Sequence, residues 1–116
     1  MVKRVVVGAH YGSRDWLAQR VTAVVMAAYT LLTLAIALYN GGIDYALWQR
    51  LVAGAAFRVA TLLFALALLW HAWIGMRDIW MDYVKAAGLR LALEVLTVIV
   101  LLAYAAWLVQ ILWGHV

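Results

Sequence analysis

One histidine lies deep in an apolar stretch of this sequence, and two aspartates and a tyrosine follow it. His71 comes after a long apolar run, and Asp78, Asp82 and Tyr83 lie beyond it. An imidazole in such surroundings can form a structural hydrogen bond, relay protons, or ligate a metal or haem iron. A phenol beside a carboxylate suits hydrogen bonding to a carbonyl group and proton delivery. Spacing alone leaves all three roles of the histidine open.

A helical conformation would place the histidine and both aspartates on one face. At about 100° per residue they share a stripe roughly 60° wide. His71, Gly75, Asp78 and Asp82 form this stripe, and Ala60, Phe64 and Ala67 extend it upstream. Gly75, one turn after His71, leaves space for a flat group against the helix, and Trp73 faces the other way. The stripe therefore fits either a flat, bulky ligand or a closely packed neighbouring helix.

Composition places the chain among membrane proteins. Of its 116 residues, 70% are hydrophobic and 12% are charged, which is too little polar surface to cover a soluble domain. Three runs of about 18 or 19 residues lack formal charge and are long enough to cross a hydrocarbon core of about 30 Å. These runs are Val21–Tyr39, Val59–Met76 and Val95–Trp113. The predicted fold is an all-α membrane protein with three transmembrane helices in a single domain over residues 1–116.

The expected helices span residues 14–40, 52–84 and 89–114, within a margin of a few residues. Ser13 is expected to cap the first helix, with Asp15 stabilising its first turn. Between the first two helices, Asp44–Leu51 is expected to form a short amphipathic segment in the membrane interface. In the third helix, Arg90 and Glu94 have the i, i+4 spacing of an ion pair.

The basic residues predict how the chain crosses the membrane. Seven lie near the N-terminus or the connection between the second and third helices, and two lie on the opposite side. The seven are Lys3, Arg4, Arg14, Arg20, Arg77, Lys85 and Arg90, and the two are Arg50 and Arg58. Because cytoplasmic loops are enriched in basic residues, the N-terminus and the second connection are expected in the cytoplasm and the C-terminus in the periplasm.

Several other residues have alternative explanations. Arg20, at the start of the first helix, either extends to lipid phosphates or clamps an anionic group of a cofactor. Residues 1–12 form a short polar leader without the apolar core of a secretory signal. His10 in this leader and His115 near the C-terminus are expected to be solvent-exposed.

The residue types that are missing exclude several kinds of chemistry. Cysteine is absent, which removes disulfides and cysteine-ligated iron–sulfur clusters from this polypeptide. The sequence also has no glycine-rich nucleotide loop. Chemistry on a polar substrate would therefore need partner subunits, and no nucleic-acid partner is expected.

The run His71-x-x-x-Gly75-Met76, followed by Asp82-Tyr83, resembles the second-helix signature of the small D-type cytochrome b anchor subunit of succinate dehydrogenase, respiratory complex II. The resemblance covers the length, the three spans, the spacing of Ser13 and Arg20, and the Asp-Tyr-Val-Lys sequence that ends at Lys85. It implies a bundle formed with a larger cytochrome b anchor subunit in a bacterial inner membrane. The other implied partners are an iron–sulfur subunit, a flavoprotein subunit and membrane lipid.

The same resemblance implies a role for four residues. His71 corresponds to an axial ligand of haem b, which the two anchor subunits share. Tyr83 corresponds to the hydrogen-bond donor to ubiquinone, with Asp82 beside it as a proton relay. Arg20 corresponds to an arginine near the haem propionates.

The number of imidazoles agrees with a shared haem. Bis-histidine ligation needs two imidazoles, and His71 is the one histidine within the three apolar runs. The second ligand would come from another polypeptide, in a heterodimer or a homodimer. Two alternatives to the succinate dehydrogenase role stay open, namely the anchor of a quinol:fumarate reductase and a small proton-coupled transporter or scaffold. The absence of proline is less typical of transporters, whose spans are often broken near the midplane.

Overall fold

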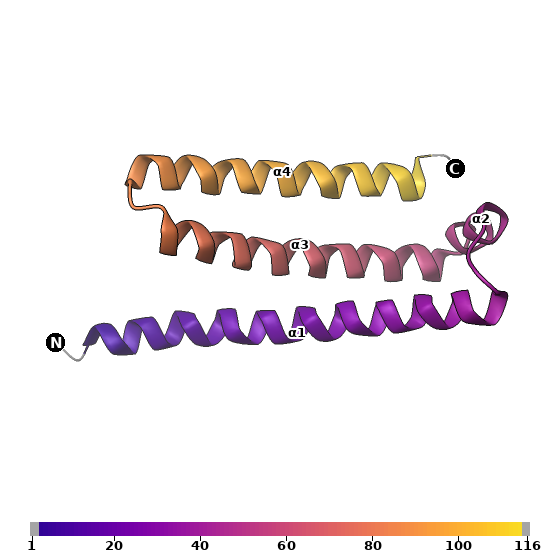
Figure 1. Cartoon of the computed structure of the whole chain (residues 1–116), viewed down its shortest axis with the longest axis horizontal. Coiled ribbons are helices and arrows are strands. Elements are labelled where there is room, and N and C mark those ends of the chain that lie inside the picture. The colour runs from indigo at the N-terminus through magenta and orange to yellow at the C-terminus, as the bar shows by residue number, and fades with distance from the viewer. Residues whose placement is uncertain (1–2, 115–116) are drawn as a thin grey trace.

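The computed structural model describes the backbone of residues 3–114 and the side chains of residues 13–114. Within this part of the chain four helices follow one another: α1 (Lys3–Asn40), α2 (Tyr45–Ala53), α3 (Ala55–Tyr83) and α4 (Ala87–Trp113). The long helices α1, α3 and α4 run back and forth, and short α2 lies at the turn between α1 and α3 (Figure 1). Each long helix contains a stretch apolar enough to span a membrane. The prediction of an all-α protein with three such spans is confirmed.

The start of α1 differs from the prediction. Ser13 does not cap this helix, because the helix already begins at Lys3 and continues without a break to Asn40. The preceding residues contain no proline, and an isolated glycine costs a helix only about 1 kcal/mol, so nothing there ends the helix. Asp15 therefore lies inside α1, where its carboxylate contacts another helix instead of an N-terminus.

Two glycines follow α1 and end it. Gly41 and Gly42 have φ angles of 71° and 124°, a region that side chains disfavour. This turn lets the Gly42 N–H donate to the Ala37 carbonyl at 2.7 Å, which satisfies one of the last carbonyls of the helix.

The short segment after this turn is a helix with a polar cap. The Asp44 carboxylate accepts from the Leu47 N–H at 2.8 Å, and the buried residues of α2 are Leu47 and Val52. The predicted amphipathic segment is thus a short helix, Tyr45–Ala53, which extends beyond the predicted end at Leu51. Its location in the membrane interface stays a prediction. The second long helix starts later than the predicted residue 52, because Gly54 has an extended backbone and separates α2 from α3.

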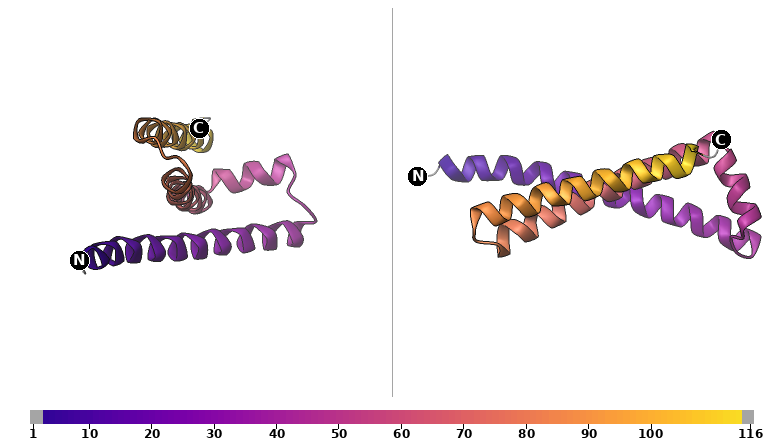
Figure 2. Two further views of the ribbon diagram at one scale, coloured as in Figure 1. Left: turned by 60° about the vertical axis from the view of Figure 1, so that its left-hand side comes forward. Right: turned by 90° about the horizontal axis from the view of Figure 1, so that it is seen from above.

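Helix α3 occupies the middle of the molecule. It packs against α1 on one side and α4 on the other, and α1 crosses it at an angle while α4 runs along it (Figure 2). In the most apolar stretch of α3, 17% of the residues are buried, against 6% in α1 and in α4. The outer helices therefore leave most of their apolar surface for lipid or other membrane helices, and α3 has the best-protected positions for a functional side chain.

Candidate functional site

His71 lies half-buried on α3 and faces α1. Its Nδ1 atom lies 3.0 Å from the hydroxyl oxygen of Thr22, which is only 4% exposed. Among residues 13–114, no hydrogen bond is formed by the other ring nitrogen, Nε2. The imidazole is thus held by this chain through one nitrogen, while the second is available to an external group.

The stripe around His71 changes from buried to exposed along α3. Ala67, one turn before the histidine, is 8% exposed, whereas Asp78 and Asp82 are exposed. A Cβ atom placed on Gly75 would meet nothing within 4 Å. Open space therefore adjoins the half-buried imidazole on the side of Gly75, and this donor set and space fit a flat group ligated through Nε2.

Arg20 is exposed and does not contact His71. Its guanidinium carbon lies 5.2 Å from the centroid of the Trp16 ring, one turn earlier on α1. Arg20 and Thr22 are two positions apart, or about 200° around the helix, so they leave α1 in nearly opposite directions. Within this chain alone, Arg20 and His71 are not brought together.

Asp82 and Tyr83 form a second location at the end of α3. Both residues are exposed, Tyr83 to 79%. The helix is unbroken from His71 to Tyr83, so twelve residues at 1.5 Å place them about 18 Å apart along its axis. The Lys85 ammonium approaches the Asp82 backbone carbonyl, at 3.5 Å, and not its carboxylate. The structure therefore separates the histidine from the tyrosine–aspartate pair.

An ion pair that the sequence analysis missed joins α1 to α3. The Arg77 guanidinium pairs with the Asp15 carboxylate, and its Nε lies 4.0 Å from Asp78 Oδ1. The same guanidinium lies 5.9 Å from the centroid of the Trp73 ring. Asp15 is seven positions before Thr22, and Arg77 is six positions after His71, so an antiparallel helix pair in contact at Thr22 and His71 brings these charges together. This matched spacing on two antiparallel helices was the one signal from which the ion pair could have been predicted.

The predicted ion pair between Arg90 and Glu94 is wrong. Among the side chains of residues 13–114, the ion pairs are those of Arg77 with Asp15 and Asp78. An acid four residues before a base is the favourable order on a helix, and α4 has the reverse order. Glu94 is half-buried in a groove that Trp73 also lines. The side chains of His10 and His115 lie outside the described residues.

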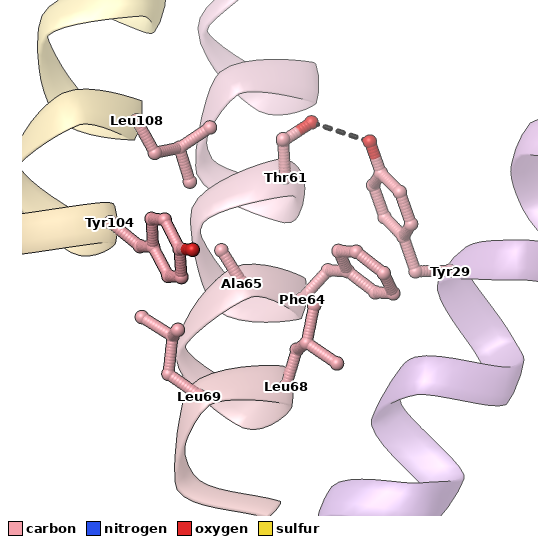
Figure 3. A pocket seen from close by; sticks show the side chains of 8 residues that line it. All are labelled: Tyr29, Thr61, Phe64, Ala65, Leu68, Leu69, Tyr104 and Leu108. Carbon is pink, nitrogen blue, oxygen red and sulfur yellow. Dashed lines mark hydrogen bonds between the residues drawn. The ribbon is translucent and has the colours of Figure 1, made fainter. Parts of the chain in front are cut away.

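A separate pocket of about 400 Å³ opens between the three long helices (Figure 3). The Tyr29 hydroxyl and the Thr61 hydroxyl are 2.7 Å apart at one wall, and the Tyr29 ring stacks on Phe64 with centroids 4.5 Å apart. The Tyr104 hydroxyl is the third polar group of the lining, and the other side chains are apolar. His71, Arg20, Asp82 and Tyr83 are not part of it.

Comparison with known proteins bears on this arrangement. Residues 3–111 match the family model described as the transmembrane subunit of succinate dehydrogenase/fumarate reductase. A protein of Coxiella burnetii is 39% identical over 102 residues, which cover 88% of this chain and 89% of that protein. A protein of Rickettsia felis is 35% identical over 88 residues, which cover 73% and 71%. Both relatives are named succinate dehydrogenase hydrophobic membrane anchor subunits. The chain therefore belongs to the succinate dehydrogenase/fumarate reductase transmembrane subunit family, as its second-helix signature led us to expect.

Proposed function

We propose that this chain is the smaller anchor subunit of a succinate:ubiquinone oxidoreductase and that His71 ligates haem b. The observation that carries this proposal is the half-buried imidazole between α1 and α3, hydrogen-bonded through Nδ1. The two relatives, both named as succinate dehydrogenase anchors, support the same assignment. In this role the chain binds the iron–sulfur and flavoprotein subunits to the bacterial inner membrane.

The residues around His71 would hold the haem as follows. His71 Nε2 would ligate the iron, and the open space at Gly75 would accept part of the macrocycle. Arg20, which is exposed and leaves α1 nearly opposite to Thr22, would have to turn from the Trp16 ring to neutralise a propionate in the assembled complex. The larger anchor subunit would supply the second imidazole, because bis-histidine ligation needs two. A bound haem b supplies a centre that accepts and releases one electron.

The end of α3 would bind ubiquinone. The Tyr83 phenol can donate a hydrogen bond to a quinone carbonyl, and the adjacent Asp82 carboxylate can pass on protons that reduction consumes. Both side chains are exposed where α3 meets its connection to α4. This location suits a quinone head group that meets an iron–sulfur partner at the membrane surface while its tail stays in lipid.

The test of haem ligation is the variant His71→Ala in the complete complex. We expect the low-spin bis-histidine spectrum to disappear or weaken, because no other histidine lies in the three apolar runs. His10→Ala, which changes a histidine outside these runs, is the matched control and should leave the spectrum unchanged. An unaltered spectrum in His71→Ala would exclude ligation by this residue.

A quinol:fumarate reductase anchor is the second candidate, because the family description names fumarate reductase as well. The two functions share the membrane chemistry and differ in direction, which depends on the partner subunits. Comparing succinate-dependent quinone reduction with quinol-dependent fumarate reduction in the same membranes distinguishes them. Faster fumarate reduction would favour the second candidate.

A further inference from the structure

The Thr22 hydroxyl has three polar neighbours. The Ala18 carbonyl lies 2.7 Å away and the Gln19 carbonyl 3.2 Å away, both on α1. The third neighbour is His71 Nδ1 on α3, at 3.0 Å. A hydroxyl has one hydrogen to donate and two lone pairs that accept. The position of this single hydrogen therefore decides which partner of the Thr22–His71 contact is the donor.

A second threonine in the same chain has comparable neighbours, and there the donor and the acceptor are unambiguous. The Thr97 hydroxyl donates to the carbonyl of Leu93, four residues earlier, at 2.7 Å. It also meets Trp80 Nε1 of a neighbouring helix at 2.9 Å. An indole N–H can only donate, so the oxygen of Thr97 must accept while its hydrogen is directed to its own helix.

The same reasoning assigns the proton at His71. Carbonyl oxygens cannot donate, so the contacts of Thr22 with its own helix use the hydroxyl hydrogen. With its hydrogen directed to these carbonyls, the hydroxyl oxygen faces Nδ1 as an acceptor. This arrangement favours the tautomer that has a hydrogen on Nδ1. In a neutral imidazole this tautomer leaves the lone pair on Nε2, which is the nitrogen without a hydrogen bond among residues 13–114.

We propose that Thr22 is the positioning residue for His71: its hydroxyl oxygen accepts the Nδ1 hydrogen, fixes the ring orientation and keeps Nε2 unprotonated for the haem iron. This inference rests on the proposed haem ligation and names a residue of this chain that controls it. Metal-bound histidines commonly donate their other N–H to an acceptor that orients the ring and raises its basicity.

Neighbouring contacts hold Thr22 in place. The Asp15–Arg77 ion pair lies two helical turns before it on α1. The Tyr29–Thr61 hydrogen bond lies two turns after it. Both contacts join the same two helices, so Thr22 and His71 face each other at a position that is secured on either side.

The experiment compares Thr22→Val, Thr22→Ser and Thr61→Val in the complete complex, by haem content, ferric EPR g values and haem midpoint potential. Valine keeps the shape of threonine but removes the acceptor, so the imidazole becomes a weaker base and the ferric haem is less stabilised. We expect the ferric-to-ferrous ratio at a given potential to change by about threefold to tenfold, or about 30–60 mV upward at 59 mV per tenfold for one electron. The g values should also change, because the ring can turn.

Two of these variants are controls. Thr22→Ser keeps the hydroxyl and should stay near the wild-type potential. Thr61→Val removes a hydrogen bond between the same helices, from a threonine that is also buried and does not touch His71, and should leave the haem signals unchanged. Wild-type signals in Thr22→Val, or equal shifts in Thr22→Val and Thr61→Val, would overturn the inference.

The outcome is separable from that of the proposed function. If His71→Ala abolishes the spectrum and Thr22→Val leaves the potential and g values unchanged, ligation stands and the positioning role is wrong. If Thr22→Val assembles without haem, the smaller variant Thr22→Ala is measured as well. Loss of haem from both, with normal loading of Thr22→Ser and Thr61→Val, supports the inference, and loss from all four variants contradicts it.

Discussion

At the scale of single residues, the proposed chemistry is divided between two locations on one helix. His71 is half-buried in the middle of the α1–α3 interface, whereas Tyr83 is exposed at the end of α3. About 18 Å of helix separates them. An electron carrier benefits from protection, and a site for an exchanging substrate needs access. The two locations provide these separately, so variants at each should have different effects.

Tyr83→Phe is expected to lower quinone reductase turnover about threefold to tenfold, because one neutral hydrogen bond contributes about 0.5–1.5 kcal/mol. Succinate oxidation by a soluble dye that accepts electrons before the quinone site should be preserved. Measuring both activities on the same preparation checks this prediction. The control is Tyr39→Phe, which changes an exposed tyrosine at the C-terminal end of α1. It should behave as wild type. Equal loss of both activities in Tyr83→Phe would indicate failed assembly.

At the scale of elements, the α1–α3 interface contains a polar contact every two turns. Asp15, Thr22 and Tyr29 are seven residues apart on α1, and each meets a polar side chain of α3. Lipid tails are as apolar as leucine, so burial of apolar surface does little to hold membrane helices together. Hydrogen bonds and close packing must therefore fix the register of α1 on α3, and with it the position of His71.

The Asp15–Arg77 pair should contribute modestly to this register. The two side chains are 39% and 27% exposed, so solvent screening limits their coupling to about 0.2–1 kcal/mol. We expect Asp15→Asn and Arg77→Gln to lower the thermal stability of the complex slightly. The double variant should lose less than the sum of the single losses. Strictly additive losses in this double-mutant cycle would show that the pair contributes no coupling.

At the scale of the whole molecule, α3 is flanked by helices while α1 and α4 are largely exposed. Large apolar side chains on both outer helices, such as Leu31 and Leu102, remain more than 60% exposed. Such surface is stable against lipid and equally suited to helices of a larger anchor subunit. The proposed shared haem requires one of these surfaces near His71 to be covered in the complex.

The arrangement of the helices also makes the predicted topology testable. Arg50 lies on α2, at the turn between α1 and α3, and Lys85 lies in the connection from α3 to α4, at the other end of α3 (Figure 1). Both residues are exposed. Cysteines introduced at these positions into the cysteine-free chain should react with an impermeant reagent from opposite sides of the membrane, Lys85→Cys from the cytoplasm.

A cysteine at Ala67, which is buried on α3, is the control and should react from neither side. Labelling of Arg50→Cys and Lys85→Cys from one common side would contradict the three-span topology. Labelling from opposite sides but with the locations exchanged would keep the three spans and reverse the orientation that the basic residues predict.

The class of the protein, its three spans and the histidine of the proposed site follow from the sequence alone. These features are local: in lipid each backbone polar group must be satisfied within its own helix, so hydrophobic length defines the spans. The short segment after the first span was also readable locally, whereas its cap, the Asp44 carboxylate, is a finding of the structure. The start of α1 could not be predicted in this way. Ser13 can cap a helix only if the residues before it are not helical, and α1 already begins at Lys3.

Which side chains meet depends on how the helices pack. Thr22 and His71 are 49 positions apart, and Asp15 and Arg77 are 62 positions apart. Helices that are apolar on all sides give no periodic signal of the face that packs against a neighbour. The crossing of α1 over α3 sets this face, and with it the hydrogen-bond partner of His71, the open space at Gly75 and the nitrogen that is left for a ligand.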